Sequence, residues 1–164
     1  MLMKSVEKTP IGLLYLISDG DFLLGAGFRS HADLIRRMDE KDQSQKISLV
    51  KSIPLASKAV QHYFDGDINA FNSLKCRQPG GDFYQSVWKE MRKIKAGTVF
   101  SYGELARRAG NSRASRAAGT ACATNLIAPI IPCHRVIRTG GDLGNYGFGL
   151  QKKEWLLTFE GAIS

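Results

Sequence analysis

The residues best suited to do chemistry in this 164-residue chain stand in succession at Cys133, His134 and Arg135. A thiolate is the reactive form of cysteine, and cationic neighbours favour it by lowering the pKa of the thiol. Adjacent residues in a regular strand or helix point apart, so Cys133 and His134 can cooperate only if the backbone turns here, directly or through a water. The alternative is a small buried cysteine beside a surface histidine, which has no catalytic role.

The other cysteines are weaker candidates for a nucleophile. Cys76 lies between two basic residues but has no histidine nearby, and Cys122 lies in an alanine-rich segment where packing is the simpler role. Three widely spaced cysteines fit neither a disulfide framework nor a zinc ribbon, so we expect reduced thiols. His31, His62 and Cys76 are too few and too scattered to hold a metal, and we predict none.

The charge of the chain is concentrated in its second half. The formal net charge is +8, and the stretch from Ser86 to Gly140 holds ten lysines and arginines against only Glu90 and Glu104. Such an excess favours a polyanionic partner such as DNA. A solvated surface with no partner is the alternative, and charge alone does not decide between them.

Composition predicts a folded protein outside the membrane. Hydrophobic residues make up 43% and charged residues 23% of the chain, with no low-complexity tract. The first ten residues lack the apolar run of a signal peptide, and no stretch approaches the roughly 20 apolar residues of a membrane-spanning helix. We therefore expect a soluble protein with no membrane partner, located in the cytoplasm, or in the nucleus of a eukaryote.

The elements of the first half predict a small α/β domain. Residues 11–17 and 22–28 form two apolar runs around a turn, which is typical of a β-hairpin. Apolar spacing predicts helices near residues 34–38 and over 54–64. Turn residues over 71–81, with Pro79-Gly80-Gly81, mark a boundary. We predict domains at residues 1–78 and 79–164.

The second half predicts mainly helices. Asp82 can cap a helix that has a buried aromatic stripe, and this helix is expected to end at Gly97. Ser101 and Glu104 have the spacing of a capping box and open a helix that ends at Gly110. A second helix over 114–124, capped by Asn111 or Ser112, completes a candidate helix-turn-helix carrying four arginines.

The predicted nucleophile lies between two irregular segments. Residues 128–132 are apolar and contain two prolines, which excludes a central strand. Residues 136–137 have a strand pattern, and a helix is predicted over 151–159. The glycine-rich loop 139–149 between them lacks the pattern of a phosphate-binding loop.

The order of motifs over residues 81–160 resembles that of the O6-alkylguanine-DNA alkyltransferases, also called methylated-DNA-protein-cysteine S-methyltransferases. The Pro-Cys-His-Arg-Val pentapeptide is the most specific of them. The first half matches loosely, through its hairpin and Tyr63-Phe-Asp-Gly66, and the resemblance implies a ribonuclease H-like sheet-plus-helix domain there. The shared motifs are Phe83-Tyr-Gln-Ser-Val-Trp88, Ser101-Tyr-Gly-Glu-Leu-Ala106, Arg116-Ala-Ala-Gly119, Asn125, Ile131-Pro-Cys-His-Arg-Val-Ile137, Tyr146, Lys153-Glu-Trp-Leu-Leu157 and Glu160.

The resemblance implies a reaction and roles for named residues. Cys133 would accept the alkyl group of an O6-alkylguanine irreversibly, so that one molecule acts once and needs no cofactor. His134 would be its base, and Glu160 would orient His134. Asn125 would brace the turn, and Tyr102 would donate a proton or hydrogen bond to the departing guanine. The residues around Asn125, Thr124 and Leu126, depart from the glycine and proline usual in the family.

The resemblance also implies how DNA is held. The partner would be double-stranded DNA containing O6-alkylguanine, bound by a monomer. The sequence leaves open whether O4-alkylthymine is a second substrate and whether binding to DNA is cooperative. Arg116 would fill the gap left by a nucleotide flipped into a pocket, with the helix in the minor groove. Further DNA contacts would be Ser101, Tyr102, Ala117, Thr120 and Arg135, and the pocket would be walled by Pro132, Val136, Tyr146 and Gly147.

Two other functions remain open at this point. A non-catalytic lesion-binding protein would flip the damaged base without accepting its alkyl group, although such relatives replace the acceptor cysteine. A cysteine hydrolase using Cys133, His134 and Glu160 would turn over repeatedly, but it would leave the basic second half unexplained.

Overall fold

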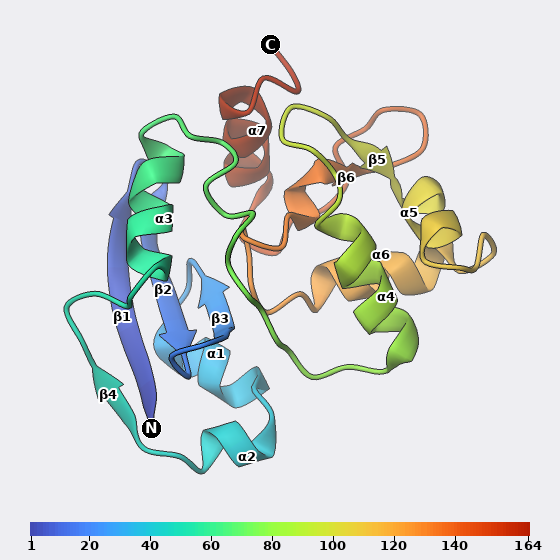
Figure 1. Cartoon of the computed structure of the whole chain (residues 1–164). Coiled ribbons are helices and arrows are strands. Elements are labelled where there is room, and N and C mark those ends of the chain that lie inside the picture. Colours follow the sequence, from blue (N-terminus) through green and yellow to red (C-terminus); the bar gives the residue numbers. More distant parts are fainter. The chain divides into compact units, whose positions relative to one another are not determined.

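The computed structural model describes all residues, 1–164, and shows a mixed α/β protein, as predicted. Its contacts divide the chain into two compact units: Met1–Pro79 with Leu126–Ile130, and Gly80–Asn125 with Ile131–Ser164 (Figure 1). The short segment 126–130 joins the first unit because the backbone of Ala26 bonds Leu126 and Ala128 on its two sides. A division into domains 1–78 and 79–164 stays a prediction.

The first unit is built on a four-stranded sheet in the order β3-β2-β1-β4. The hairpin predicted from residues 11–28 is confirmed, since β2 and β3 pair antiparallel. A strand that was not predicted, β1, precedes it and pairs with β2. This strand was not predicted because the charged residues Lys4, Glu7 and Lys8 interrupt its hydrophobic pattern. The strands are β1 (Leu2–Thr9), β2 (Gly12–Ser18), β3 (Leu23–Gly27) and β4 (Ile47–Leu49).

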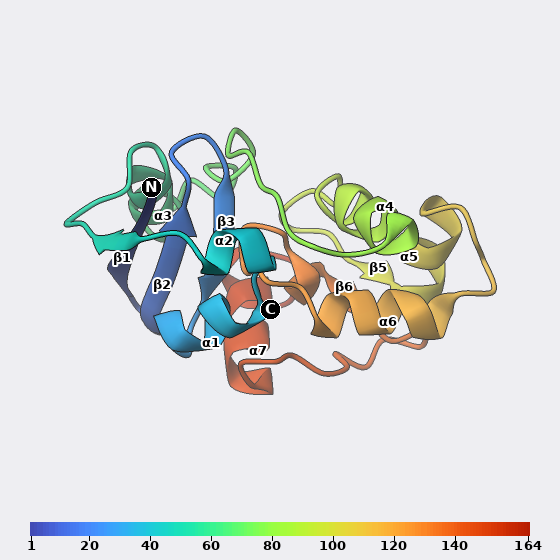
Figure 2. The same cartoon turned by 90° about the horizontal axis from the view of Figure 1, so that it is seen from below.

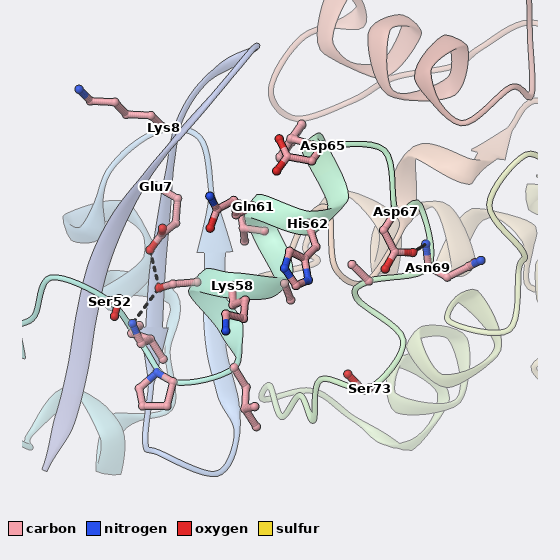
Figure 3. A pocket seen from close by; sticks show the side chains of 18 of the residues that line it. Glu7, Lys8, Ser52, Lys58, Gln61, His62, Asp65, Asp67, Asn69 and Ser73 are labelled. Atoms are coloured by element: carbon pink, nitrogen blue, oxygen red, sulfur yellow. Dashed lines mark hydrogen bonds between the residues drawn. The ribbon is translucent and has the colours of Figure 1, made fainter.

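Helices cover both faces of this sheet, α3 on one and α1 on the other (Figures 1 and 2). Both were predicted, whereas the single turn of α2 was not. On the α3 side Ser57 Oγ donates to Glu7 Oε2 at 2.7 Å and accepts the N–H of Ile53, which ties helix to strand (Figure 3). The helices are α1 (His31–Arg37), α2 (Glu40–Gln43) and α3 (Ala56–Phe64).

A hollow of about 1020 Å³ lies around α3 (Figure 3). Its walls mix basic side chains such as Lys58 and His62 with acidic ones such as Asp65 and Asp67. None of the residues predicted to act in chemistry or DNA binding lines it.

The second unit is mainly helical, with two short parallel strands, β5 and β6. Asp82 does not cap helix α4 as predicted: it is the first residue of the helix, and the N-cap is Gly81, with no side-chain hydrogen bond. The helix ends at Met91 rather than at Gly97, and Val87 and Trp88 lie in the core. The elements are α4 (Asp82–Met91), β5 (Phe100–Ser101), α5 (Tyr102–Arg108), α6 (Ser115–Ala123), the 3-10 turn η1 (Cys133–Arg135), β6 (Val136–Ile137) and α7 (Leu150–Phe159). No helix is both long and apolar enough to cross a membrane.

Helices α5 and α6 pack against each other, and both contact α4. Ser101 caps α5 by accepting the N–H of Glu104, but the Glu104 carboxylate pairs with arginines of the last turn, so only half of the predicted capping box forms. Neither Asn111 nor Ser112 caps α6, which begins after Ala114 with no side-chain cap. Asn111 instead accepts the N–H of Arg113 and closes the connecting loop. The assignment of this pair as a DNA-binding helix-turn-helix stays a prediction.

Candidate functional site

The backbone turns at Cys133, as cooperation between this residue and His134 requires. The 3-10 turn η1 follows Pro132 and is closed by a bond from the Arg135 N–H to the Pro132 carbonyl at 3.0 Å. Asn125 braces the approach by donating to the Ile131 carbonyl at 2.8 Å. A hydrogen bond from Asn125 also reaches the Cys133 thiol. Asn125 therefore fixes both the backbone before the turn and the thiol of Cys133.

His134 and Glu160 form a fully buried pair. His134 Nε2 lies 3.0 Å from Glu160 Oε2, and both side chains have no exposed surface. Burial by itself raises the pKa of Glu160, but hydrogen bonds from Arg135 and His134 outweigh it and lower the pKa to about 2. Burial lowers the pKa of His134, against the opposing effect of Glu160. A neutral imidazole beside a charged carboxylate is the result.

The second nitrogen of His134, Nδ1, is buried and makes no hydrogen bond within the protein. Since a neutral imidazole has one N–H, and the carboxylate of Glu160 can only accept, the proton belongs on Nε2. Nδ1 then carries the lone pair and is the basic atom of the ring. Glu160 thus selects the tautomer as well as the orientation of His134.

Arg135 was predicted to contact DNA, but its side chain lies inside the protein. It is 6% exposed, too deep to meet a phosphate. Its Nε and Nη2 donate to the two oxygens of Glu160 at 2.9 and 2.8 Å, and its Nη1 donates to the Ile94 carbonyl at 2.7 Å. Arginine suits this position because its planar fork matches a carboxylate. Arg135 fixes Glu160, which in turn fixes His134.

A cavity of about 780 Å³ opens beside Cys133 within the second unit. Tyr146 and Gly147, predicted as pocket walls, line it. Pro132 and Val136, predicted in the same role, do not: both are buried, and Val136 pairs with Phe100 in the small sheet. The lining residues are Tyr102, Ser115, Arg116, Gly119, Thr120, Cys122, Ala123, Cys133, Arg138, Asn145, Tyr146 and Gly147.

The thiol of Cys133 lies at the wall of this cavity and is 7% exposed. Burial raises its pKa, while the hydrogen bond from Asn125 and the positive charge of Lys153 lower it. Tyr102 lines the same cavity, and burial raises its pKa to about 12. At neutral pH the phenol therefore keeps its proton and can donate it into the cavity.

Helix α6 presents Arg116 and Thr120 to the cavity, and Arg116 is exposed to solvent. Tyr102, also predicted as a DNA contact, lines the cavity too, whereas Ala117, Ser101 and Arg135 do not. Ala117 is half-buried on α6, and the hydroxyl of Ser101 is used in capping α5. Gly119 leaves room for the ring of Tyr102, whose carbon Cδ1 is 3.8 Å from where a Cβ would stand.

Several residues of the site were not predicted from the sequence. Among them, Arg138 and Asn145 line the cavity, and Lys153 is completely buried. A signal for Lys153 was available. It shares one face of the last helix with three other buried positions, Leu156, Leu157 and Glu160. Helical spacing therefore places it inward, where a lysine is rare unless it has a function.

Comparison with known proteins gives one consistent result. Residues 82–162 match the family model described as "6-O-methylguanine DNA methyltransferase, DNA binding domain". The methylated-DNA-protein-cysteine methyltransferase of Shigella flexneri is 35% identical over 167 residues, covering 99% of this chain and 97% of that protein. The protein of the same name from Methanosarcina acetivorans is 35% identical over 158 residues, covering 96% and 97%.

Solved structures agree with these sequence matches. The Mycobacterium tuberculosis O6-methylguanine methyltransferase superposes with a TM-score of 0.79 at 31% identity, covering 100% of this chain and 95% of the other. Mycobacterium tuberculosis OGT in complex with DNA superposes with a TM-score of 0.83 at 32% identity, covering 98% and 93%.

Proposed function

This chain belongs to the methylated-DNA-protein-cysteine methyltransferase family, and we propose that it repairs DNA by direct reversal, moving the alkyl group of an O6-alkylguanine onto its own Cys133. The observation that carries the proposal is the placement of the Cys133 thiol. It lies at the wall of a cavity, beside a protonated Tyr102 and an exposed Arg116, and next to the buried pair His134 and Glu160. A non-catalytic lesion-binding protein would not need this base behind its cysteine.

Activation of the nucleophile follows from the tautomer of His134. Its neutral ring takes the proton of Cys133 on Nδ1, directly or through one water. Because Nε2 bonds Glu160, the imidazolium that forms faces a carboxylate at 3.0 Å. Arg135 keeps that carboxylate in place and ionised. The result is a thiolate in the wall of the cavity.

Transfer is a single displacement at the alkyl carbon. The Cys133 sulfur forms a bond to carbon while the bond from that carbon to O6 breaks, and its electron pair goes to the guanine. The Tyr102 hydroxyl donates a hydrogen bond or its proton to the guanine. The proton that His134 took from Cys133 is then returned to Tyr102 or to the guanine, so that the products are a thioether, a neutral imidazole and a neutral guanine. The product is a thioether, which has no ready route back to thiolate. The protein is therefore a single-use reagent, and DNA supplies the alkyl group without a cofactor.

The reacting guanine must leave the duplex before the thiolate can reach it. An alkyl carbon on O6 lies within the base stack, and flipping the nucleotide costs a few kcal/mol. Arg116, exposed on α6 at the cavity, can fill the vacated space with its stem and bond the orphaned base with its guanidinium. Because the substrate is DNA, the protein acts where the genome is, which is the cytoplasm in bacteria and archaea such as those that supply its relatives.

Mass spectrometry tests the proposal. We expect duplex DNA with one O6-methylguanine to add one methyl group to the Cys133 peptide, with an endpoint proportional to the amount of protein. Cys133→Ala should bind the lesion without gaining a methyl group, and Cys122→Ser, a matched loss of the neighbouring thiol, should still transfer. Tight binding by the unaltered chain with Cys133 unmodified would favour the lesion-binding function. Repeated turnover of an ester would favour the hydrolase.

The role of Arg116 has its own test. Arg116→Ala should slow transfer from duplex DNA at least tenfold more than transfer from free O6-benzylguanine, because only the duplex requires flipping. Arg113→Ala is the matched control, since Arg113 is exposed nearby but does not line the cavity. Equal losses on the two substrates would remove the role from Arg116.

A further inference from the structure

Lys153 is a buried cation whose three partners are all backbone carbonyls. It has no exposed surface. Its Nζ donates to the carbonyl oxygens of Val136 at 2.7 Å, of Asn145 at 3.2 Å and of Leu143. Three donated bonds require three N–H groups, which only the ammonium form possesses. The geometry therefore selects the charged form of the side chain.

These bonds join the strand that follows the Cys133 turn to the glycine-rich loop. Val136 follows the turn that carries Cys133, while Leu143 and Asn145 flank Gly144 in the glycine-rich loop. Gly144 has φ +76°, and a Cβ there would stand 3.2 Å from the Tyr102 hydroxyl. The ammonium thus holds the loop close against the ring of Tyr102, with Asn145 in the cavity wall.

No carboxylate compensates the charge of Lys153. None of its hydrogen bonds or ion pairs involves an acid, and the nearby carboxylate of Glu160 is occupied by Arg135 and His134. A buried charge without a partner is costly. The anion that forms beside it during the reaction is the thiolate of Cys133, in the turn against which α7 packs.

The Lys153 ammonium and the Cys133 thiol each affect the pKa of the other. Burial raises the pKa of the Cys133 thiol, and the positive charge of Lys153 opposes that rise. Burial lowers the pKa of Lys153, and the charge of a Cys133 thiolate opposes that fall. The other titratable or charged groups around the thiol are Tyr102 on α5, Arg116 and Cys122 on α6, His134 within the turn, and Arg138 after β6.

We propose that Lys153 is a positioning residue for alkyl transfer, whose buried ammonium favours the thiolate of Cys133 and fixes the loop at residues 143–145 against the cavity. This inference rests on the proposed function and adds to it a second source of activation. His134 removes the proton, and Lys153 stabilises the anion that remains.

The test compares the thiolate population of Cys133 with its ability to accept an alkyl group from DNA. The rate of Cys133 alkylation by iodoacetamide, followed by mass spectrometry across pH, reports the thiolate. In Lys153→Met we expect the midpoint to rise by about one pH unit, because a neighbouring opposite charge shifts a pKa by one to three units. Lys152→Met, the same charge change one residue away, should leave the midpoint where it is. A Lys153→Met midpoint equal to that of the unaltered chain would overturn the proposal.

A second variant separates charge from loop shape. Gly144→Ala should slow transfer from DNA, since its Cβ meets the Tyr102 hydroxyl and its φ of +76° strains an alanine, yet keep the iodoacetamide midpoint, since it removes no charge. If Gly144→Ala raised the midpoint as much as Lys153→Met does, loop shape rather than charge would explain the effect, and the proposal would fail.

A further measurement does not depend on the folding of Lys153→Met. Nuclear magnetic resonance of labelled lysine side chains should show Lys153 titrating about one pH unit lower in Cys133→Ser than in the unaltered chain, because coupling between two sites is reciprocal. Identical titrations would refute the inference. Methyl transfer to Cys133 in the unaltered chain tests the proposed function separately, so the two ideas can fail independently.

Discussion

Replacing Glu160 by glutamine should cost the protein about 3 kcal/mol of unfolding free energy at neutral pH. The carboxylate of Glu160 is fully buried and receives bonds from Arg135 and His134. These lower its pKa from 4.5 to about 2 in the folded state. A difference of about 2.5 pKa units corresponds to about 3.4 kcal/mol, at 1.36 kcal/mol per unit. Glutamine keeps the size and one acceptor oxygen but not the charge.

The pH dependence follows from the direction of the shift. A carboxyl group with a depressed folded pKa stabilises the fold fully above its unfolded pKa, and that stability is lost as pH falls through the folded value. For Glu160 the window runs from 4.5 down to about 2. Of the 3.4 kcal/mol, about 1.4 kcal/mol should be gone by about pH 3.5.

Urea unfolding followed by the fluorescence of Trp88 and Trp155 measures both effects. The unaltered chain and Glu160→Gln should differ by about 3 kcal/mol at pH 7 and should converge as pH falls below 4.5. The difference between the two proteins isolates Glu160 from other acids that titrate in the same range. A gap that stayed constant from pH 7 to about pH 3 would show that the charge of Glu160 is not what stabilises the fold, and would refute the reasoning.

Two further changes test the cavity and the core. Tyr102→Phe should lower the single-turnover rate of alkyl transfer about a hundredfold while DNA binding is kept. In the unaltered chain this rate should not fall near pH 10, since the pKa of Tyr102 is about 12. Rapid-quench kinetics measures both, and equal rates for Tyr102→Phe and the unaltered chain would contradict the prediction. Gly80→Ala should cost about 1–3 kcal/mol, because its Cβ would stand 2.6 Å from the ring of Trp88, whereas Gly81→Ala meets nothing within 4 Å and should cost less; thermal unfolding distinguishes the two.

Local sequence signals predicted most of the elements. Periodicity located the hairpin and the helices α1, α3, α4 and α7, and the Ser101 cap located the start of α5. The strand β1 was missed because charged residues interrupt its hydrophobic alternation. The end of α4 and the start of α6 were misplaced for a related reason. Several residues can begin or end a helix equally well in sequence, and packing decides which of them does.

The residues of the candidate site also fall into those that the sequence predicted and those that it did not. The order of Cys133, His134 and the motifs around them is enough to indicate a nucleophile and its family. The roles of Arg135 and Lys153 did not follow from sequence, because an arginine or a lysine is most often exposed and its neighbours in the chain do not say otherwise. Their partners, Glu160 and the carbonyl groups of residues 136, 143 and 145, come from other segments of the chain.

By itself the sequence determined which side chains are available, which local elements form and which family the chain resembles. Tertiary structure alone decided which cations face solvent and which are buried, and therefore which of them can meet DNA and which can act on Cys133. The physical reason is that the pKa of a group and its hydrogen bonds depend on everything within a few ångströms. Around the Cys133 thiol those neighbours come from α5, α6, α7 and the glycine-rich loop, which only folding brings together.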